Sequence, residues 1–130
     1  MTNRAKDWLK QAEEEMRWVE DGQKSERWAM VCFLSQQVAE KSLTCIAVAR
    51  GASQIKSHSL RELATALGIN GEIEKMSRVL DQYYITTRYP DSFYSGAPYE
   101  YFTEEQARQA HEYAAGFLEL ARAEIVSDGS

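Results

Sequence analysis

The sequence predicts an all-α fold, an up-and-down four-helix bundle with one additional short helix. Apolar residues recur at the three- and four-residue spacing of amphipathic helices along most of the 130 residues. No segment has the alternation of a half-buried strand, and Gly or Pro separates the helical stretches. We therefore expect one domain over residues 1–130, with a frayed tail from about residue 127.

The first helix is expected over residues 2–20, with Thr2 or Asn3 as its N-cap and Gly22 just after its end. One face carries an apolar stripe, made of Ala5, Leu9, Ala12, Met16 and Val19. The three glutamates at 13–15 lie mostly away from this stripe, and we interpret them as a solvated surface. The short link that follows predicts antiparallel packing on the next helix.

The longest helix is expected over residues 25–50, with Ser25 as its N-cap and Gly51 after its last residue. Its apolar residues fill about half of the helix circumference. A face this wide needs neighbours on more than one side, so we place this helix at the centre of the bundle. Ser35 and Ser42 lie within that face, where small side chains allow another helix to approach closely.

A short third helix follows, capped by Ser57 or Ser59 and ended by Gly68. His58 lies at its start. A lone histidine in this position more often bonds helix-end backbone groups or packs on a neighbouring helix than binds a ligand.

Two further helices complete the predicted bundle. The fourth begins at Asn70 or Gly71 and ends near Thr87. The last begins with a capping box, in which Thr103 is the N-cap and Gln106 bonds back to it.

The composition limits the classes of function. The net charge of −5 argues against sequence-independent binding to duplex nucleic acid as the main role. Cys32 and Cys45 fall in one helix about 20 Å apart by helical rise, too far for a disulfide, so they are interpreted as core residues of a cytosolic protein. No long apolar run indicates a membrane span or a signal peptide, and a cytoplasmic location is expected.

The connection over residues 88–102 is unusually long and rich in rings. Two interpretations stay open. Its tyrosines can act as stacking platforms beside Arg88, as in proteins that hold nucleobases or single strands. Alternatively, the rings cover the open end of the bundle or fill a dimer interface, where Tyr and Arg are enriched.

Several segments together resemble the HEPN domain, an all-helical family named for its occurrence in higher eukaryotes and prokaryotes and for nucleotide binding. The resembling segments are Ala5 with Trp8, residues 33–43 (FLSQQVAEKSL), His58-Ser59-Leu60 followed by Leu63, Leu80-Asp81, and residues 87–91 (TRYPD). Their order and spacing extend over nearly the whole chain.

The resemblance implies a bundle of four longer helices and a short one, commonly assembled as a symmetric homodimer. It also implies two functional branches. Many bacterial members work with a small nucleotidyltransferase as a toxin–antitoxin module, and other members are ribonucleases. The ribonuclease signature is an Arg followed, after four to six residues, by a His.

This sequence departs from that signature. At the expected spacing from Arg88 stand Phe93, Tyr94 and Ser95, and His111 follows Arg108 after only two residues. Arg88 can supply a cation for phosphate, yet the acid/base needed for metal-independent RNA cleavage has no obvious candidate by spacing. The missing signature therefore argues against an enzyme.

The leading hypothesis is a homodimeric module that binds a nucleotide such as ATP or GTP, or a nucleotidyltransferase partner. No cofactor, metal or catalytic residue is assigned, because no metal-ligand spacing or glycine-rich phosphate loop is present. The candidate binding residues are Arg88, Tyr89, Asp91, Tyr94, Tyr84, His58, Glu40 and Lys41. The alternatives are a ribonuclease with an atypical acid/base and a domain that only dimerises.

Overall fold

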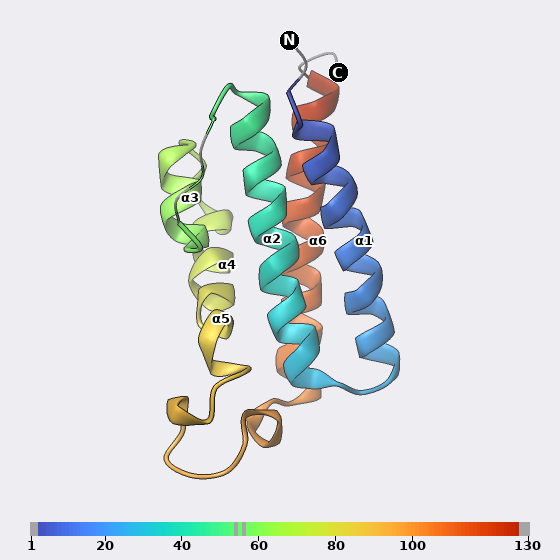
Figure 1. Cartoon of the computed structure of the whole chain (residues 1–130), viewed down its shortest axis with the longest axis vertical. Coiled ribbons are helices and arrows are strands. Elements are labelled where there is room, and N and C mark those ends of the chain that lie inside the picture. The colour runs from blue at the N-terminus through green and yellow to red at the C-terminus, as the bar shows by residue number, and fades with distance from the viewer. Residues whose placement is uncertain (1–2, 54, 56, 128–130) are drawn as a thin grey trace.

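The computed structural model describes residues 3–53, 55 and 57–127, and every regular element among them is helical. The elements are α1 (Ala5–Lys24), α2 (Trp28–Ala49), α3 (Leu60–Ala66), α4 (Glu72–Asp81), α5 (Tyr83–Thr86), the 3-10 turns η1 (Pro90–Ser92) and η2 (Pro98–Tyr101), and α6 (Glu104–Ser127). Helices α1, α2 and α6 run side by side along the molecule, and α3, α4 and α5 follow one another along the other side of α2 (Figure 1). The predicted all-α bundle is confirmed.

Helix α2 lies at the centre, as its wide apolar face predicts. It contacts α1, α3, α4, α5, α6 and η2. Ser35 and Ser42 are fully buried on this helix, together with Val31, Val38 and Leu43. Small hydroxyl side chains at these two positions let the neighbouring helices pack closely against the backbone of α2.

The boundary between α1 and α2 differs from the prediction. α1 continues through Gly22 to Lys24, and Ser25 is its C-cap rather than the N-cap of α2. A Cβ atom at Gly22 would come within 2.8 Å of Met30 Cε and 3.0 Å of Val31 Cγ2. Gly22 is therefore a contact point between two helices, and its effect is on packing rather than on termination.

The turn after α1 is a Schellman motif. The Arg27 N–H donates to the Gly22 carbonyl at 2.9 Å, and the Glu26 N–H donates to the Gln23 carbonyl at 3.3 Å. Glu26 occupies the left-handed position with φ 57°. This motif replaces the predicted serine cap, and α2 begins without a side-chain cap.

The structure describes only part of each chain end, so the predicted N-cap of the first helix and the predicted frayed tail are each tested only in part. Thr2 lies outside the described residues, and the N-cap of α1 is Arg4, so the prediction of Asn3 as the N-cap is wrong. Asn3 precedes the cap, and its Oδ1 accepts a hydrogen bond from the Ala5 N–H at 3.1 Å. α6 continues to Ser127, and positions 128–130 of the expected tail also lie outside the described residues.

The capping predictions for α3 and α6 are confirmed. Ser59 Oγ accepts from the Glu62 N–H at 3.2 Å. Thr103 Oγ1 accepts from the Gln106 N–H at 3.2 Å, and Gln106 Oε1 accepts from the Thr103 N–H at 2.9 Å. The predicted fourth helix is divided into α4 and α5 at Gln82, which keeps helical backbone angles of φ −63° and ψ −22°.

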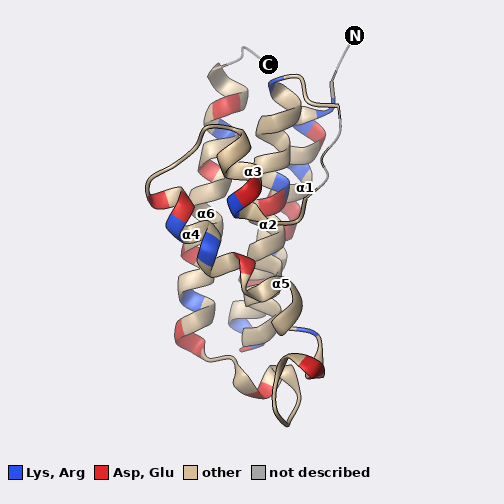
Figure 2. Cartoon of the chain, turned by 90° about the vertical axis from the view of Figure 1, so that its left-hand side faces the viewer, with Lys and Arg blue, Asp and Glu red and all other residues tan. Residues whose placement is uncertain are grey.

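The fold places the aromatic connection at one end of the bundle. It lies opposite the end at which α1 begins and α6 finishes (Figure 1). Acidic and basic residues alternate along the helices on the α3 side without a large patch of either sign (Figure 2). Among the described residues, no helix is long and apolar enough to cross a membrane.

Candidate functional site

The aromatic connection is held together by its own side chains. The Phe93 ring stacks on Tyr101 with centroids 4.1 Å apart, and it meets Phe102 edge to face at 6.2 Å. Phe102 is buried and contacts Tyr83 edge to face at 5.7 Å. For these rings the structural interpretation is confirmed: they close the end of the bundle and fix the path of the chain between α5 and α6.

Arg88 follows α5 and lies on a platform of three rings. Its Cζ atom is 4.3 Å from the Phe33 ring centroid, 4.9 Å from that of Tyr84 and 5.2 Å from that of Tyr89. Its Nε and Nη2 atoms both donate to the Tyr84 carbonyl. The side chain is exposed, and no carboxylate among the described residues forms an ion pair with it.

His58 lies against the same tyrosine. Its ring stacks on Tyr84 with centroids 4.8 Å apart and planes 17° apart. Its Nδ1 lies 3.2 Å from Glu40 Oε2 and 3.3 Å from Oε1. The His58 side chain is 64% exposed, whereas that of Glu40 is 15% exposed. A carboxylate only accepts hydrogen bonds, so Nδ1 of His58 is the donor in this contact.

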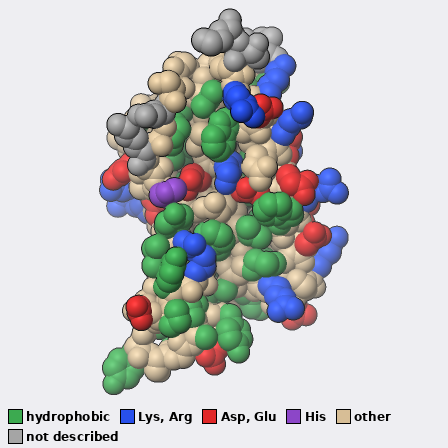
Figure 3. Space-filling model, in the orientation of Figure 1, with side chains coloured by type: hydrophobic (Ala, Val, Ile, Leu, Met, Phe, Trp, Pro, Cys, Tyr) green, Lys and Arg blue, Asp and Glu red, His purple; other side chains and the backbone are tan. Residues whose placement is uncertain are grey.

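Phe33, Glu40, His58, Tyr84, Arg88 and Tyr89 thus form one surface group, which we call the Tyr84 cluster. It joins α2, the segment before α3, and α5 with the residues after it. On the face drawn in Figure 3, hydrophobic side chains gather around a basic one below the histidine. The cluster presents a cation, an imidazole and aromatic surface together.

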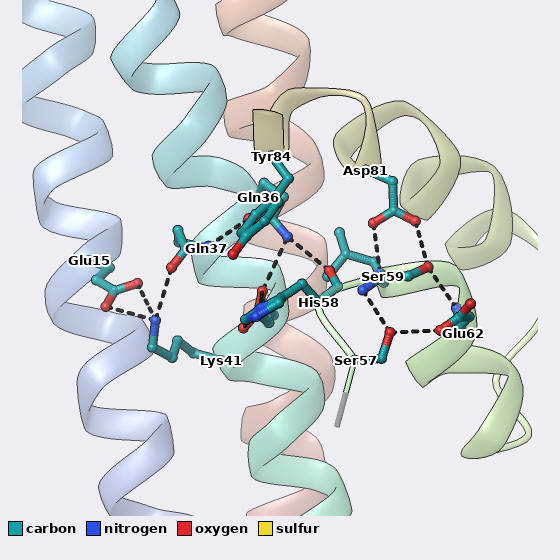
Figure 4. Close-up of polar contacts among 12 residues, drawn as sticks. Glu15, Gln36, Gln37, Lys41, Ser57, His58, Ser59, Glu62, Asp81 and Tyr84 are labelled. Carbon is teal, nitrogen blue, oxygen red and sulfur yellow. Dashed lines mark hydrogen bonds and ion pairs between the residues drawn. The ribbon is translucent and has the colours of Figure 1, made fainter. Parts of the chain in front are cut away.

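A chain of polar side chains runs from the cluster across α2 to α1 (Figure 4). Gln36, which is fully buried, donates from Nε2 to the His58 carbonyl at 3.2 Å and to Glu40 Oε1 at 3.3 Å. Gln37 donates to Gln36 Oε1 at 2.7 Å, and Lys41 Nζ donates to Gln37 Oε1 at 3.3 Å. These bonds fix the orientation of the Gln36 amide.

Lys41 continues this chain to α1, where its Nζ lies 3.2 Å from Glu15 Oε2. Glu15 is only 5% exposed. The prediction that the glutamates at 13–15 all face solvent is therefore wrong for Glu15, because the helix turns this residue toward α2 and Lys41 supplies the opposite charge.

The structure brings together five of the eight candidate residues, namely Glu40, His58, Tyr84, Arg88 and Tyr89. Lys41 is directed to α1, Asp91 is exposed on η1, and Tyr94 projects fully into solvent from the connection. Among the described residues, no group of three or more His, Cys, Asp or Glu side chains could hold a metal ion.

Two contributors to the cluster were not among the candidates. Phe33 lies on the more polar side of α2, and only the fold brings it under Arg88. Gln36 is buried, although Gln37, Glu40 and Lys41 on the same side of the helix are also polar or charged. Two sequence signals point to them: both lie in the resembling segment 33–43, and both lie one or two helical turns from Glu40.

Comparison with known proteins agrees with this architecture. A model of the HEPN domain matches residues 5–124. The chain belongs to the HEPN domain family.

Two solved structures resemble this HEPN domain closely. The crystal structure of TT1696 from Thermus thermophilus is 31% identical, with a TM-score of 0.89 over 95% of this chain and 99% of that one. The crystal structure of ST0689, an archaeal HEPN homologue, is 34% identical, with a TM-score of 0.82 over 96% of this chain and 99% of that one. A comparison with curated proteins gives no match.

Proposed function

We propose that this HEPN domain is a nucleotide-binding and interaction module in which Arg88 holds a phosphate group. It acts as a homodimer with a small nucleotidyltransferase partner, in a module of the toxin–antitoxin type. The observation that supports this proposal is the exposed guanidinium of Arg88, which lies on three rings and has no ion pair among the described residues.

The geometry of Arg88 suits an anionic ligand. The bonds from Nε and Nη2 to the Tyr84 carbonyl hold the guanidinium in place, and they leave Nη1 available to donate to phosphate oxygens. Contact with Phe33 and Tyr84 further limits its motion. A guanidinium that is already positioned loses less conformational entropy when it binds phosphate.

The neighbouring rings suit a nucleobase. Tyr89 is 49% exposed and lies beside the guanidinium. Stacking of a base on an exposed tyrosine contributes about 1–3 kcal/mol in proteins that bind single strands. A nucleotide with its phosphate on Arg88 can therefore place its base on Tyr89.

A second exposed surface, also lined by aromatic side chains, supports the proposal that protein partners bind this domain. A hollow of about 360 Å³ lies where the α1–α2 turn meets η2, and it is lined by Glu26, Arg27, Trp28, Ala29, Met30 and Tyr99. Met30 is one helical turn from Phe33, so this hollow lies beside the Tyr84 cluster along α2. Surfaces rich in Tyr, Trp, Met and Arg are typical of the centres of protein interfaces.

The proposal is tested by titrating the purified protein with ATP and GTP in a calorimeter, and by co-purification with a nucleotidyltransferase encoded in a neighbouring reading frame. Arg88→Ala should weaken nucleotide binding by roughly tenfold or more, which corresponds to about 1.4 kcal/mol. Arg88→Lys should restore only part of the affinity, because a lysine ammonium lacks the planar guanidinium that lies on the Phe33 and Tyr84 rings and bonds the Tyr84 carbonyl.

The matched control is Arg108→Ala, which removes an exposed arginine on α6 whose partner is Glu104. It should leave the affinity unchanged. Equal weakening by both substitutions would mean that the effect is general surface charge. Absence of binding to either nucleotide and to the partner, in a protein that still forms dimers, would leave a domain that only dimerises.

A further inference from the structure

We infer that two copies of this chain exchange one side chain, with Tyr94 of each copy seated in the hollow between the α1–α2 turn and η2 of the other. The inference rests on the proposed function, because it names the surface through which the proposed homodimer forms. It also gives a role to Tyr94, a candidate binding residue that the fold does not bring to the Tyr84 cluster.

Most of the large hydrophobic side chains that the structure shows as exposed gather at one end of the bundle. Val126 lies at the opposite end, near the end of α6, and Trp18 lies partway along α1. The other six lie on the aromatic connection or on the helices beside it, namely Met30, Ile85, Tyr89, Tyr94, Tyr99 and Tyr101. A concentration of this kind marks an interaction surface, whereas single exposed apolar residues do not.

Tyr94 projects from a part of the chain that is held in place. Its relative exposure of 105% means that its side chain makes almost no contact with its own chain. Its neighbours are nonetheless fixed, because the Phe93 ring stacks on Tyr101 and the Ser95 carbonyl accepts a hydrogen bond from the Tyr101 hydroxyl. A tyrosine presented in this way loses little conformational entropy when a partner covers it.

The hollow can receive such a side chain. It lies at the same end of the bundle as the connection (Figure 1). Its volume of about 360 Å³ is at the small end of the range of about 300–1,000 Å³ for ligand pockets, so it suits one or two side chains. Trp28, Met30 and Tyr99 form much of its wall. Aromatic rings pair favourably edge to face or offset, and a tyrosine ring therefore suits this wall.

The charge of the connection disfavours an anionic occupant around Tyr94. Residues 89–102 carry two acids, Asp91 and Glu100, and no cation. Both are exposed, and neither forms an ion pair within the described part of the chain. This projection would repel a nucleic acid strand or an anionic lipid surface. A protein surface that carries cations is the matching occupant.

The hollow of the same chain offers such cations. Arg27 lines the hollow, and Lys24 lies in the turn just before it. Both are exposed and have no ion pair among the residues that the structure describes, and the only acid at positions 24–27 is Glu26. The projection and the hollow are therefore complementary in charge. A twofold axis satisfies both contacts at once, because each copy gives its projection and receives that of the other.

This arrangement places the second copy next to the Tyr84 cluster. Met30 is one helical turn before Phe33 on α2, so the hollow lies beside the cluster. The connection of the second copy then borders the cluster, and a nucleotide held by Arg88 lies next to the interface between the copies.

The test measures self-association of the purified full chain by sedimentation velocity over a range of concentrations. The wild-type protein should be a dimer. Tyr94→Ala removes the projection and Tyr99→Ala removes part of the wall of the hollow. Each should raise the dimer dissociation constant roughly thirtyfold or more, because every dimer loses two contacts. Both side chains are exposed, so neither change should alter the helix content measured by circular dichroism.

A mixture of the two variants tests the pairing itself. A Tyr94→Ala copy keeps an intact hollow, and a Tyr99→Ala copy keeps an intact projection. Together they restore one of the two contacts, so the mixed pair, followed with a fluorophore on one variant, should associate more tightly than either variant alone. The matched control is Val126→Ala, which removes an exposed apolar side chain at the other end of the bundle and should leave the dissociation constant unchanged.

A wild-type dimer that persists in both Tyr94→Ala and Tyr99→Ala would overturn the inference, and the homodimer of the proposed function would then use another surface. A mixture that associates no better than its components would also overturn the pairing of Tyr94 with the hollow. A monomeric wild-type protein that binds a nucleotidyltransferase through Tyr94 would assign the surface to that partner and overturn the inference. A wild-type protein that is monomeric and binds no partner would count against both the inference and the proposed homodimer.

Discussion

The Asp81 carboxylate caps a helix that begins 21 residues before it in the chain, with Oδ1 accepting from the Leu60 N–H at 2.7 Å. Its Oδ2 also accepts from the Arg61 N–H and from the Ser59 hydroxyl, each at 3.1 Å. α3 has only seven residues, too few to persist without tertiary support. Asp81→Ala should lower the free energy of unfolding by about 2 kcal/mol, measured by urea denaturation with circular dichroism.

Asp91→Ala is the control for this change. Asp91 is exposed on η1, so its removal should alter the free energy of unfolding by less than about 0.5 kcal/mol. Equal losses for the two variants would show that Asp81 contributes no more than an ordinary surface acid.

The ion pair between Lys41 and Glu15 gives a second prediction. The two side chains are 19% and 7% exposed, and Gln11 also donates to Glu15 at 2.7 Å. Lys41→Met leaves the Glu15 carboxylate buried without a counter-charge. This should cost about 3 kcal/mol of unfolding free energy, measured by denaturant titration.

Two comparisons identify burial as the cause. The double variant Glu15→Gln/Lys41→Met removes both charges and should recover much of the loss. Arg78→Met breaks the exposed pair with Glu74, whose side chains are 64% and 46% exposed, and should cost less than about 0.5 kcal/mol. If Arg78→Met costs as much as Lys41→Met, burial of the Glu15 pair is not the reason.

The elements that the sequence predicts best are those with local signals. The Ser59 cap and the Thr103–Gln106 box each act over three residues, and the structure confirms both. The predicted end of α1 is wrong because Gly22 resembles a helix terminator. Position 22 favours glycine because a Cβ atom there would come too close to the Met30 side chain, and only the packed bundle brings Met30 there.

The same distinction applies to the site. Arg88, Tyr84 and Tyr89 are close in sequence, so a concentration of rings around one arginine predicts their proximity. Glu40 and His58 are 18 residues apart, and Lys41 and Glu15 are 26 apart. Such pairings depend on how α1, α2 and the segment before α3 are docked, which no local pattern specifies.

Glu26 provides a third prediction, because a residue with a Cβ atom occupies a left-handed backbone position there, with φ 57°. Left-handed geometry costs a non-glycine residue about 1–2 kcal/mol. Glu26→Gly should therefore raise the free energy of unfolding by about 1 kcal/mol, because glycine is the preferred residue at this position of a Schellman motif. Thermal melts of both variants measure this effect. Glu26→Ala keeps the Cβ atom and should give no such gain. A gain for Ala as large as that for Gly would point to the lost charge instead.

The fourth prediction concerns alkaline pH. Burial raises the pKa of the Cys32 thiol from 9.0 to about 12, and burial also raises the pKa of the Tyr83 phenol from 10.0 to about 12. Above about pH 9 the unfolded chain loses these protons while the folded chain keeps them, so the unfolded state binds fewer protons and stability falls as the pH rises. The loss of stability is absent below pH 9 and continues to about pH 12, with a slope of at most about 1.4 kcal/mol per pH unit for each group.

Urea denaturation at intervals from pH 8 to 11 measures this slope, and Cys32→Ala should reduce it by removing one of the two groups. A slope that Cys32→Ala leaves unchanged would mean that the thiol of the unfolded chain is already as protected as that of the folded protein.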